Sequence, residues 1–255
     1  MDSNLRYLDF FSHRSTLRAY SSTHQVSDST LQKLIEAASH APTTGNMQLY
    51  SVVATRDSQA KARLAECHFN QPAATGCSVM LTFCADFRRF ERWCEERNAR
   101  PGYRNFHSFI TALIDTVIFA QQFVTLAELN GIGSCYLGTA TYNSKAIADI
   151  IGAPDRVVPV ITLTVGYPAE DKGFPAPSDR LPAEAILHNE KYHDYSPSDI
   201  DRLYSDKENL DESARFIAEN GKETLAQVFT DIRYPKELNE RISEEFFGFI
   251  KEKGY

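Results

Sequence analysis

The chain has 255 residues, 42% hydrophobic and 24% charged, which is typical of a soluble globular protein with a sizeable core. A formal net charge of -7 argues against nucleic-acid binding, because affinity for a polyphosphate depends on an excess of Lys and Arg. The five cysteines are odd in number and lack CxxC spacing, so they predict neither a disulfide framework nor a zinc site. Residues 1–14 contain no pattern of a secretory signal, and we expect a cytoplasmic protein.

The first motif is HRSTLRAY, residues 13–20, which places Arg14 and Arg18 around Ser15 and Thr16. If the stretch is helical, the two arginines share a face and can form a solvated stripe. Alternatively, guanidinium groups bind phosphate oxygens in a bidentate way and hydroxyl groups add donors, so the cluster could bind a phosphate dianion. The motif alone leaves both interpretations open.

The first half of the chain predicts alternating helices and strands. Apolar residues recur at helical spacing after the capping box STLQ, and LYSVVAT is rich in β-branched residues. The segment CSVMLTFCAD is apolar on both faces, which indicates a central strand. The expected elements are a helix from Ser29 that ends before Pro42, a loop over 41–48, a strand over 49–55, a helix over 58–68 and a strand over 77–86.

In the second half, residues 87–105 mix Arg, Glu and aromatic residues and predict a partly exposed helix or flap. Residues 105–131 predict a long apolar helix. Polar residues such as Asp115 and Glu128 interrupt it, so we expect a helix buried in a core or between subunits and no membrane span. There follow a short glycine-flanked segment over 132–138, a helix over 142–154, a buried strand over 157–168, a loop over 170–182 and a helical tail from about residue 195.

Five motifs in this order resemble the FMN-dependent nitroreductase family. They are R-x-[ST]-x-R-x-[FY] at Arg14 to Tyr20, a capped helix, APTTGNMQ at 41–48, GIGSCYLG at 131–138, and VVPVITLTVGYP at 157–168. The segments FCADFRR, RLP, HNEKY and FFGFIKEKGY are similar to the flavin reductase and oxygen-insensitive NADPH nitroreductase subgroup.

The resemblance implies an α+β fold, a three-layer α/β/α sandwich with a mainly antiparallel central sheet flanked by helices. Residues 1–195 would form the FMN-binding domain, and 196–255 a helical C-terminal extension packed on the core or a partner subunit. The family members implied are homodimers with two FMN molecules at the subunit interface. No metal is implied.

The resemblance also assigns positions in this chain to the flavin site. Arg18 would be the electrostatic stabiliser, and the chemistry would be carried by FMN, so no catalytic side chain is expected. One loop would be contributed by the partner subunit. The implied FMN-binding residues are Arg14, Ser15, Thr16, Arg18, Thr43, Asn46, Gln48, Gln71, Tyr136, Leu137, Gly138 and Arg180. Relatives often carry additional basic residues where this chain has Ser15 and Ser178, so its site has fewer positive charges.

The implied function is an NAD(P)H oxidoreductase that reduces nitroaromatics, quinones or flavins by ping-pong hydride transfer. Small aromatic electron acceptors and NADPH or NADH would be its partners, with Arg215, Lys222 and Arg233 as candidates for the extra phosphate of NADPH. Two alternatives stay open: a flavin-fragmenting or dehalogenating relative, and a flavin-binding sensor without a catalytic cycle.

Overall fold

The computed structural model describes residues 8–255, so residues 1–7, half of the stretch searched for a signal sequence, lie outside it. The described chain forms two compact units. The first contains the residues up to Ala176 together with 244–255, and the second is Pro177–Ser243. The division at residue 195 expected from the sequence stays a prediction.

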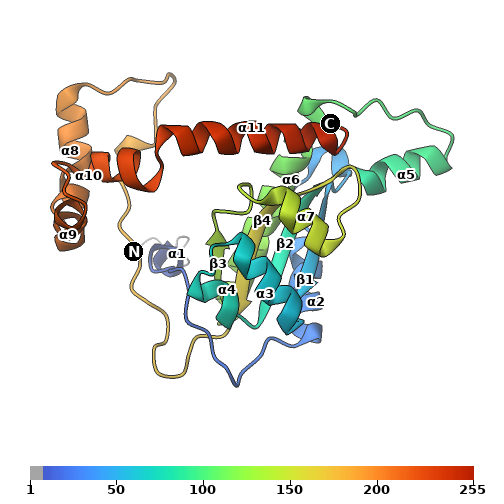
Figure 1. Ribbon diagram of the computed structural model, residues 1–255, viewed down its shortest axis with the longest axis horizontal. Coiled ribbons are helices and arrows are strands. Elements are labelled where there is room, and N and C mark those ends of the chain that lie inside the picture. The colour runs from blue at the N-terminus through green and yellow to red at the C-terminus, as the bar shows by residue number, and fades with distance from the viewer. Residues whose placement is uncertain (1–7) are drawn as a thin grey trace. The chain divides into compact units, whose positions relative to one another are not determined.

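The first unit is built around a four-stranded sheet (Figure 1). The strand order is β1-β2-β4-β3, and all three pairings are antiparallel. Every residue of β2 is buried, which confirms the central strand predicted from its two apolar faces. The strands are β1 (Tyr50–Thr55), β2 (Val79–Asp86), β3 (Gly133–Leu137) and β4 (Val157–Gly166).

Two helices cover one face of the sheet, α2 (Asp28–Ala38) and α6 (Phe106–Leu129). Phe83 of β2 lies in one hydrophobic core with Phe119 and Phe123 of α6, because each of these side chains is buried on the facing surfaces. The predicted helices are confirmed, with one correction. The side chain that caps α2 is Ser27, which accepts from the Thr30 main-chain N–H, and not Ser29.

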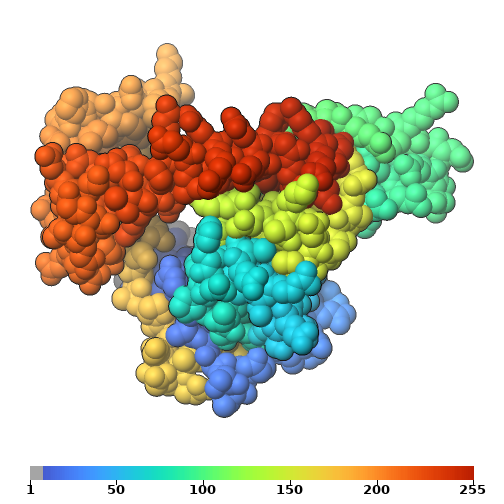
Figure 2. All heavy atoms as spheres, in the orientation of Figure 1, coloured from blue at the N-terminus to red at the C-terminus, as the bar shows by residue number. Residues whose placement is uncertain are grey.

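The opposite face is covered by α3 (Ser58–Cys67), α4 (Pro72–Gly76) and α7 (Ser144–Ile151), which completes the predicted three-layer sandwich. Leu64, Met80 and Ile147 are fully buried between these helices and the sheet. In the space-filling view the helices form a continuous layer over the sheet (Figure 2). The short α4 was missed, because PAATG has no periodicity to distinguish it from a loop.

Two other parts of this unit lie outside the three layers. α1 (Leu8–Ser12) precedes the HRSTLRAY motif and was not predicted. α5 (Arg88–Glu96) is the helical part of the expected flap, and residues 97–105 form neither helix nor strand.

The second unit is helical, as predicted for the tail. α8 (Pro197–Glu208) carries a complete capping box, in which the side chains of Ser196 and Asp199 each accept a hydrogen bond from the main-chain N–H of the other residue. The Pro-rich segment 170–182 has no helix or strand. The elements are η3 (Ala183–Ala185), α8 (Pro197–Glu208), α9 (Asp211–Glu219), α10 (Leu225–Gln227), η4 (Val228–Arg233) and the first turns of α11 (Lys236–Glu252), whose remainder belongs to the first unit.

α6 has one buried and one exposed apolar face. By length and composition it could cross a membrane, and 44% of its most apolar window is buried. The buried face packs on the sheet, as expected for a core helix. The other face exposes Ile114, Val117 and Ile118 by 51, 46 and 37%. Such a row of large apolar side chains indicates a contact surface.

Candidate functional site

Residues 14–19 of the HRSTLRAY motif form no helix, and burial alternates from Arg14 to Arg18 as in an extended segment, so the interpretation as a helical arginine stripe is wrong. The Leu17 main-chain N–H donates to the Ser134 carbonyl of β3 at 3.0 Å, and Tyr20 forms a bridge with Pro168. Ser15 and Leu17 are buried, 6% and 1% exposed. Because successive side chains of an extended segment alternate in direction, Arg14, Thr16 and Arg18 lie on its more open side.

Two glycines allow this segment to lie so close to the sheet. Gly133 and Gly166 are paired across β3 and β4. A Cβ on Gly133 would lie 2.4 Å from Leu17 Cδ2, and a Cβ on Gly166 would lie 2.7 Å from Tyr20 Cδ1. Gly133 of the GIG motif and Gly166 of the GYP motif are therefore required by the close approach of the chain.

Arg14 and Arg18 have different surroundings. Arg14 donates from Nε and Nη2 to the Glu128 carboxylate of α6 at 3.1 and 2.7 Å, and this pairing raises the pKa of Arg14. Arg18 is exposed and has no carboxylate partner within residues 8–255. Its guanidinium lies close to Cys135, whose thiol pKa is raised by burial and partly lowered again by Arg18. Of the two cations, Arg18 is the one available to an anion.

The segment Tyr136–Gly138 continues the same edge of the sheet. Tyr136 is 41% exposed, and its hydroxyl lies 3.4 Å from Gln121 Oε1 of α6. Burial of that hydroxyl raises the pKa of Tyr136 to about 12. Leu137 is buried and Gly138 is exposed. The structure thus brings these residues together with the HRSTLRAY motif.

Gln71 precedes α4, and its main-chain N–H donates to the His68 carbonyl at 3.3 Å. His68 is fully buried, and its Nδ1 lies 2.7 Å from Thr139 Oγ1, one residue after Gly138. Burial lowers the pKa of His68 to about 4, so the ring is neutral at pH 7. Sequence analysis missed His68, because a single histidine at a helix end carries no motif.

The loop with Thr43, Asn46 and Gln48 is fixed by a different part of α6. The buried Asp115 carboxylate accepts from the Thr44 main-chain N–H and hydroxyl, both at 2.9 Å, and from Leu49 N–H at 3.3 Å. Asn46 and Gln48 both have φ of 54°. Thr43 Oγ1 is buried without a hydrogen-bond partner in the described part of the chain.

Within one chain this loop is far from the basic motif. Asp115 and Glu128 are separated along α6 by about 20 Å, from the helical rise of 1.5 Å per residue. Within residues 8–255, the structure brings together the basic motif and the β3 edge, and connects Gln71 to that edge through His68 and Thr139, whereas the loop at 43–48 lies apart from them.

Arg180 belongs to the second unit, where it is exposed and donates to the Asp179 carbonyl of its own loop at 2.7 Å. Its role stays a prediction. Three further basic residues of this unit already have partners: Arg215 pairs with Glu212 and Glu219, Lys222 with Asp231, and Arg233 lies 4.4 Å above the Phe216 ring.

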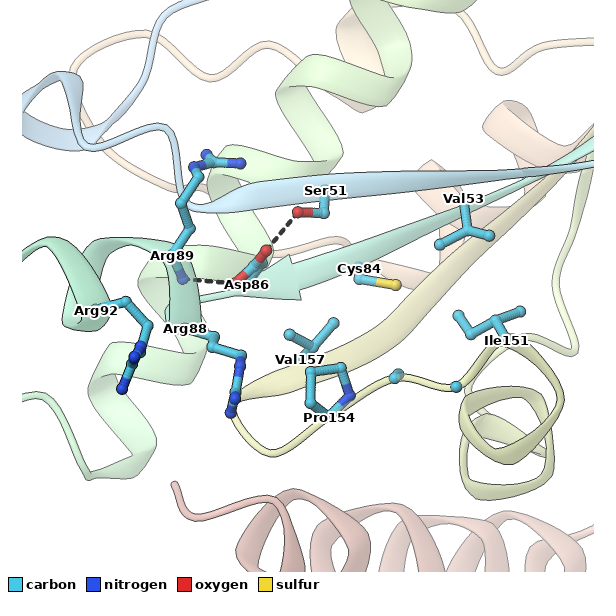
Figure 3. Close-up of a pocket in the computed structure, with 12 residues that line it drawn as sticks. Ser51, Val53, Cys84, Asp86, Arg88, Arg89, Arg92, Ile151, Pro154 and Val157 are labelled. Atoms are coloured by element: carbon cyan, nitrogen blue, oxygen red, sulfur yellow. Dashed lines mark hydrogen bonds between the residues drawn. The ribbon is translucent and has the colours of Figure 1, made fainter.

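A separate cavity of about 450 Å³ opens on the face of the sheet that carries α7 (Figure 3). Ser51, Val53 and Cys84 line it, with arginines of α5 at one side. None of the predicted FMN-binding residues line this cavity. Burial raises the pKa of Cys84 to about 12, so this thiol is a core residue as expected and no nucleophile.

The comparisons with known proteins agree with this architecture. Residues 11–167 match the model of the nitroreductase family. The chain is 30% identical over 165 residues to an FMN reductase (NADPH) of Bacillus subtilis, covering 64% of this chain and 65% of that relative. It is 27% identical over 194 residues to a CR(VI) reductase of Pseudomonas sp., covering 76% and 78%.

A crystal structure from Bacteroides fragilis superposes with a TM-score of 0.93 at 51% identity, covering 96% of this chain and 98% of that one. The chain belongs to the nitroreductase family. The resemblance stated from the five motifs is confirmed, and so is the predicted α+β sandwich.

Proposed function

We propose that this protein is an FMN-dependent NAD(P)H oxidoreductase that reduces nitroaromatics, quinones or flavins. FMN, when bound, would accept a hydride from NADPH or NADH and pass two electrons to an acceptor. Membership of the nitroreductase family and the FMN reductase named among its relatives support this function. The observation that carries the proposal is Arg18, an exposed guanidinium without a carboxylate partner in residues 8–255, beside the sheet edge.

The residues present fit the cofactor. Arg18 offers a free cation for the phosphate or the polar edge of the ring, and Thr16 and the Gly138 main chain provide neutral partners at the same edge. The buried hydroxyl of Thr43, which lacks a partner within the described residues, suits a ligand atom that accepts or donates one hydrogen bond. The twelve FMN-binding residues named above stay our proposal, and these observations support it at Arg18, Thr16, Gly138 and Thr43.

A homodimer would supply what one chain lacks. The loop at 43–48 is about 20 Å along α6 from the basic motif, so a partner subunit's copy is needed to bring the two together. The exposed apolar face of α6, with Ile114, Val117 and Ile118, is our proposed dimer interface. We also propose a cytoplasmic location, which agrees with five free, buried thiols.

The proposed function is tested by the absorbance spectrum of the purified protein and its anaerobic titration with NADPH and NADH. We expect a yellow dimer that bleaches with either donor and regains its colour with a quinone or a nitroaromatic acceptor. Arg18→Ala should weaken flavin binding by about 10- to 100-fold, since a charge-assisted hydrogen bond contributes ~1.5–3 kcal/mol. Lys145→Ala, at an exposed ion pair on α7, is the control and should bind flavin normally.

The outcomes separate the alternatives. A colourless monomer that binds no FMN contradicts the proposal. Bound FMN that no nicotinamide reduces would indicate a sensor, and cleavage of the flavin or release of halide from the acceptor would indicate a fragmenting or dehalogenating relative.

A further inference from the structure

Glu128 occupies an unfavourable position for an acid. It lies in the last turn of the 24-residue α6, where the helix dipole is negative and where no basic residue of the helix compensates it. Its side chain is only 8% exposed, so water does little to stabilise the charge. A carboxylate retained there against both effects requires a cation from elsewhere, and Arg14 supplies it through two hydrogen bonds.

This pairing changes how much positive charge the basic motif can offer to an anionic ligand. Arg14 and Glu128 together carry no net charge, whereas Arg18 keeps its full charge and is exposed. Glu128 and Gln121, which contacts Tyr136, lie two turns apart on α6. The helix therefore holds the motif through Arg14 and the β3 edge through Tyr136.

We propose that Glu128 sets the charge of the flavin site: by holding Arg14 in a neutral pair it leaves Arg18 as the cation that binds the anionic group of the ligand. The inference rests on the proposed function for the identity of the ligand. The inference departs from the assignment of both Arg14 and Arg18 as FMN-binding residues.

Arginine modification tests the pairing without any flavin. Phenylglyoxal labelling of the flavin-free protein, read by mass spectrometry, should modify Arg18 at least about tenfold faster than Arg14, since a bidentate pair must open before reaction. In Glu128→Gln, Arg14 should become reactive. Arg56 is the matched control, because its side chain is 31% exposed against 28% for Arg14 and it pairs with Asp28 at 2.8 Å. Its labelling should not change.

Flavin affinity tests the division of roles. FMN and riboflavin differ only by the phosphate, and both can be titrated by fluorescence quenching. Arg18→Ala should raise the Kd of FMN by about 10- to 100-fold and that of riboflavin much less. Glu128→Gln keeps a hydrogen-bond acceptor but frees one positive charge. It should lower the Kd of FMN a few fold, leave that of riboflavin unchanged and make FMN binding more salt-dependent.

Three results would overturn the inference. They are equal labelling of Arg14 and Arg18 in the unaltered protein, an FMN Kd that rises as much in Arg14→Ala as in Arg18→Ala, or a Glu128→Gln variant that weakens FMN and riboflavin equally. Circular dichroism of each variant verifies its fold. If the labelling pattern is as expected but neither flavin binds, the proposed function fails while the Arg14–Glu128 pairing stands.

Discussion

Two arginine–glutamate pairs in the first unit use the same chemistry in different surroundings. Arg156 Nε and Nη2 each lie 2.9 Å from a Glu91 carboxylate oxygen, with both side chains 5% exposed. Arg14 binds Glu128 with the same two nitrogens at 3.1 and 2.7 Å, but is 28% exposed. The pairs differ in whether the remaining N–H groups of the guanidinium are enclosed.

The enclosed pair of Arg156 and Glu91 connects several distant parts of the chain. Arg156 also donates to the Tyr103 and Gly254 carbonyls at 2.7 and 3.0 Å, and its guanidinium lies 3.9 Å above the Tyr255 ring. The pair thereby connects α5, the start of β4 and the residues after α11. An enclosed pair fixes the fold, whereas an open pair at a sheet edge adjoins the proposed ligand site.

The largest expected effect comes from breaking the enclosed pair. Glu91→Ala leaves the Arg156 charge buried without a counter-ion and should lower the free energy of unfolding by about 3–5 kcal/mol. Urea unfolding followed by circular dichroism measures it. The double variant Glu91→Leu with Arg156→Met should recover most of the loss, because no charge is left buried. Lys145→Ala breaks an ion pair that is 60 and 56% exposed and should have no measurable effect.

His68 is a buried histidine that, within the described residues, has no charged partner. Its pKa is about 4 in the folded protein against 6.5 when unfolded, so the unfolded chain binds more protons between these values. Its contribution to stability is complete above pH 6.5 and is lost as the pH falls toward 4. From pH 7 to pH 5, the free energy of unfolding should therefore fall by about 2 kcal/mol because of His68.

His68→Gln should remove that part of the pH dependence, measured by urea unfolding at both pH values. His40→Gln, at an exposed histidine, should keep it. A slope unchanged in His68→Gln would mean that another group is responsible.

Asp115 is a buried carboxylate that uses N–H and O–H donors in place of an arginine. In Asp115→Asn one acceptor oxygen becomes a donor and faces the donors of Thr44 or Leu49, which should cost about 1–3 kcal/mol. Hydrogen exchange of residues 44–49 should become faster. The exposed Asp149→Asn serves as the control, and unchanged exchange in Asp115→Asn would contradict its role in fixing the loop.

The position of the basic motif, which carries Arg14 of the open pair, depends on the absence of a side chain at Gly133. Gly133→Ala places a methyl group 2.4 Å from Leu17 Cδ2, so the basic motif must move away from β3, at a cost of about 1–3 kcal/mol. Thermal unfolding and the rate of proteolysis between residues 14 and 18 measure the change. Gly76→Ala meets no atom within 4 Å and should be close to neutral in both measurements.

The elements were largely predictable because they depend on local patterns. The continuous apolar run of β2 and the long apolar run of α6 were recognisable in the sequence. A strand buried on both faces, or a helix buried around most of its surface, contains few polar residues. Short pieces such as α4 were not recognisable, because five residues carry too little periodicity. The cap of α2 was misplaced by two residues because Ser27 and Ser29 are both suitable N-cap residues and the sequence defines helix ends poorly.

The site was predictable only as a set of residues. Arg14 and Arg18 appear equivalent in HRSTLRAY, and no local pattern shows that Glu128, 114 residues further along, pairs with the first and not with the second. The same holds for His68 with Thr139, and for Asp115 with its loop. Such partners are set by packing, which brings distant residues together.

The sequence by itself determined the family, most of the longer helices and strands and the types of residue at the sheet edge, because motif spacing and hydrophobic periodicity are local properties of the chain. Only the tertiary structure decided that the first motif is extended, that Gly133 and Gly166 make room for it, and which arginine keeps its charge free. Those outcomes depend on distances and burial between segments far apart in the chain, and these exist only once the sheet and α6 have packed together.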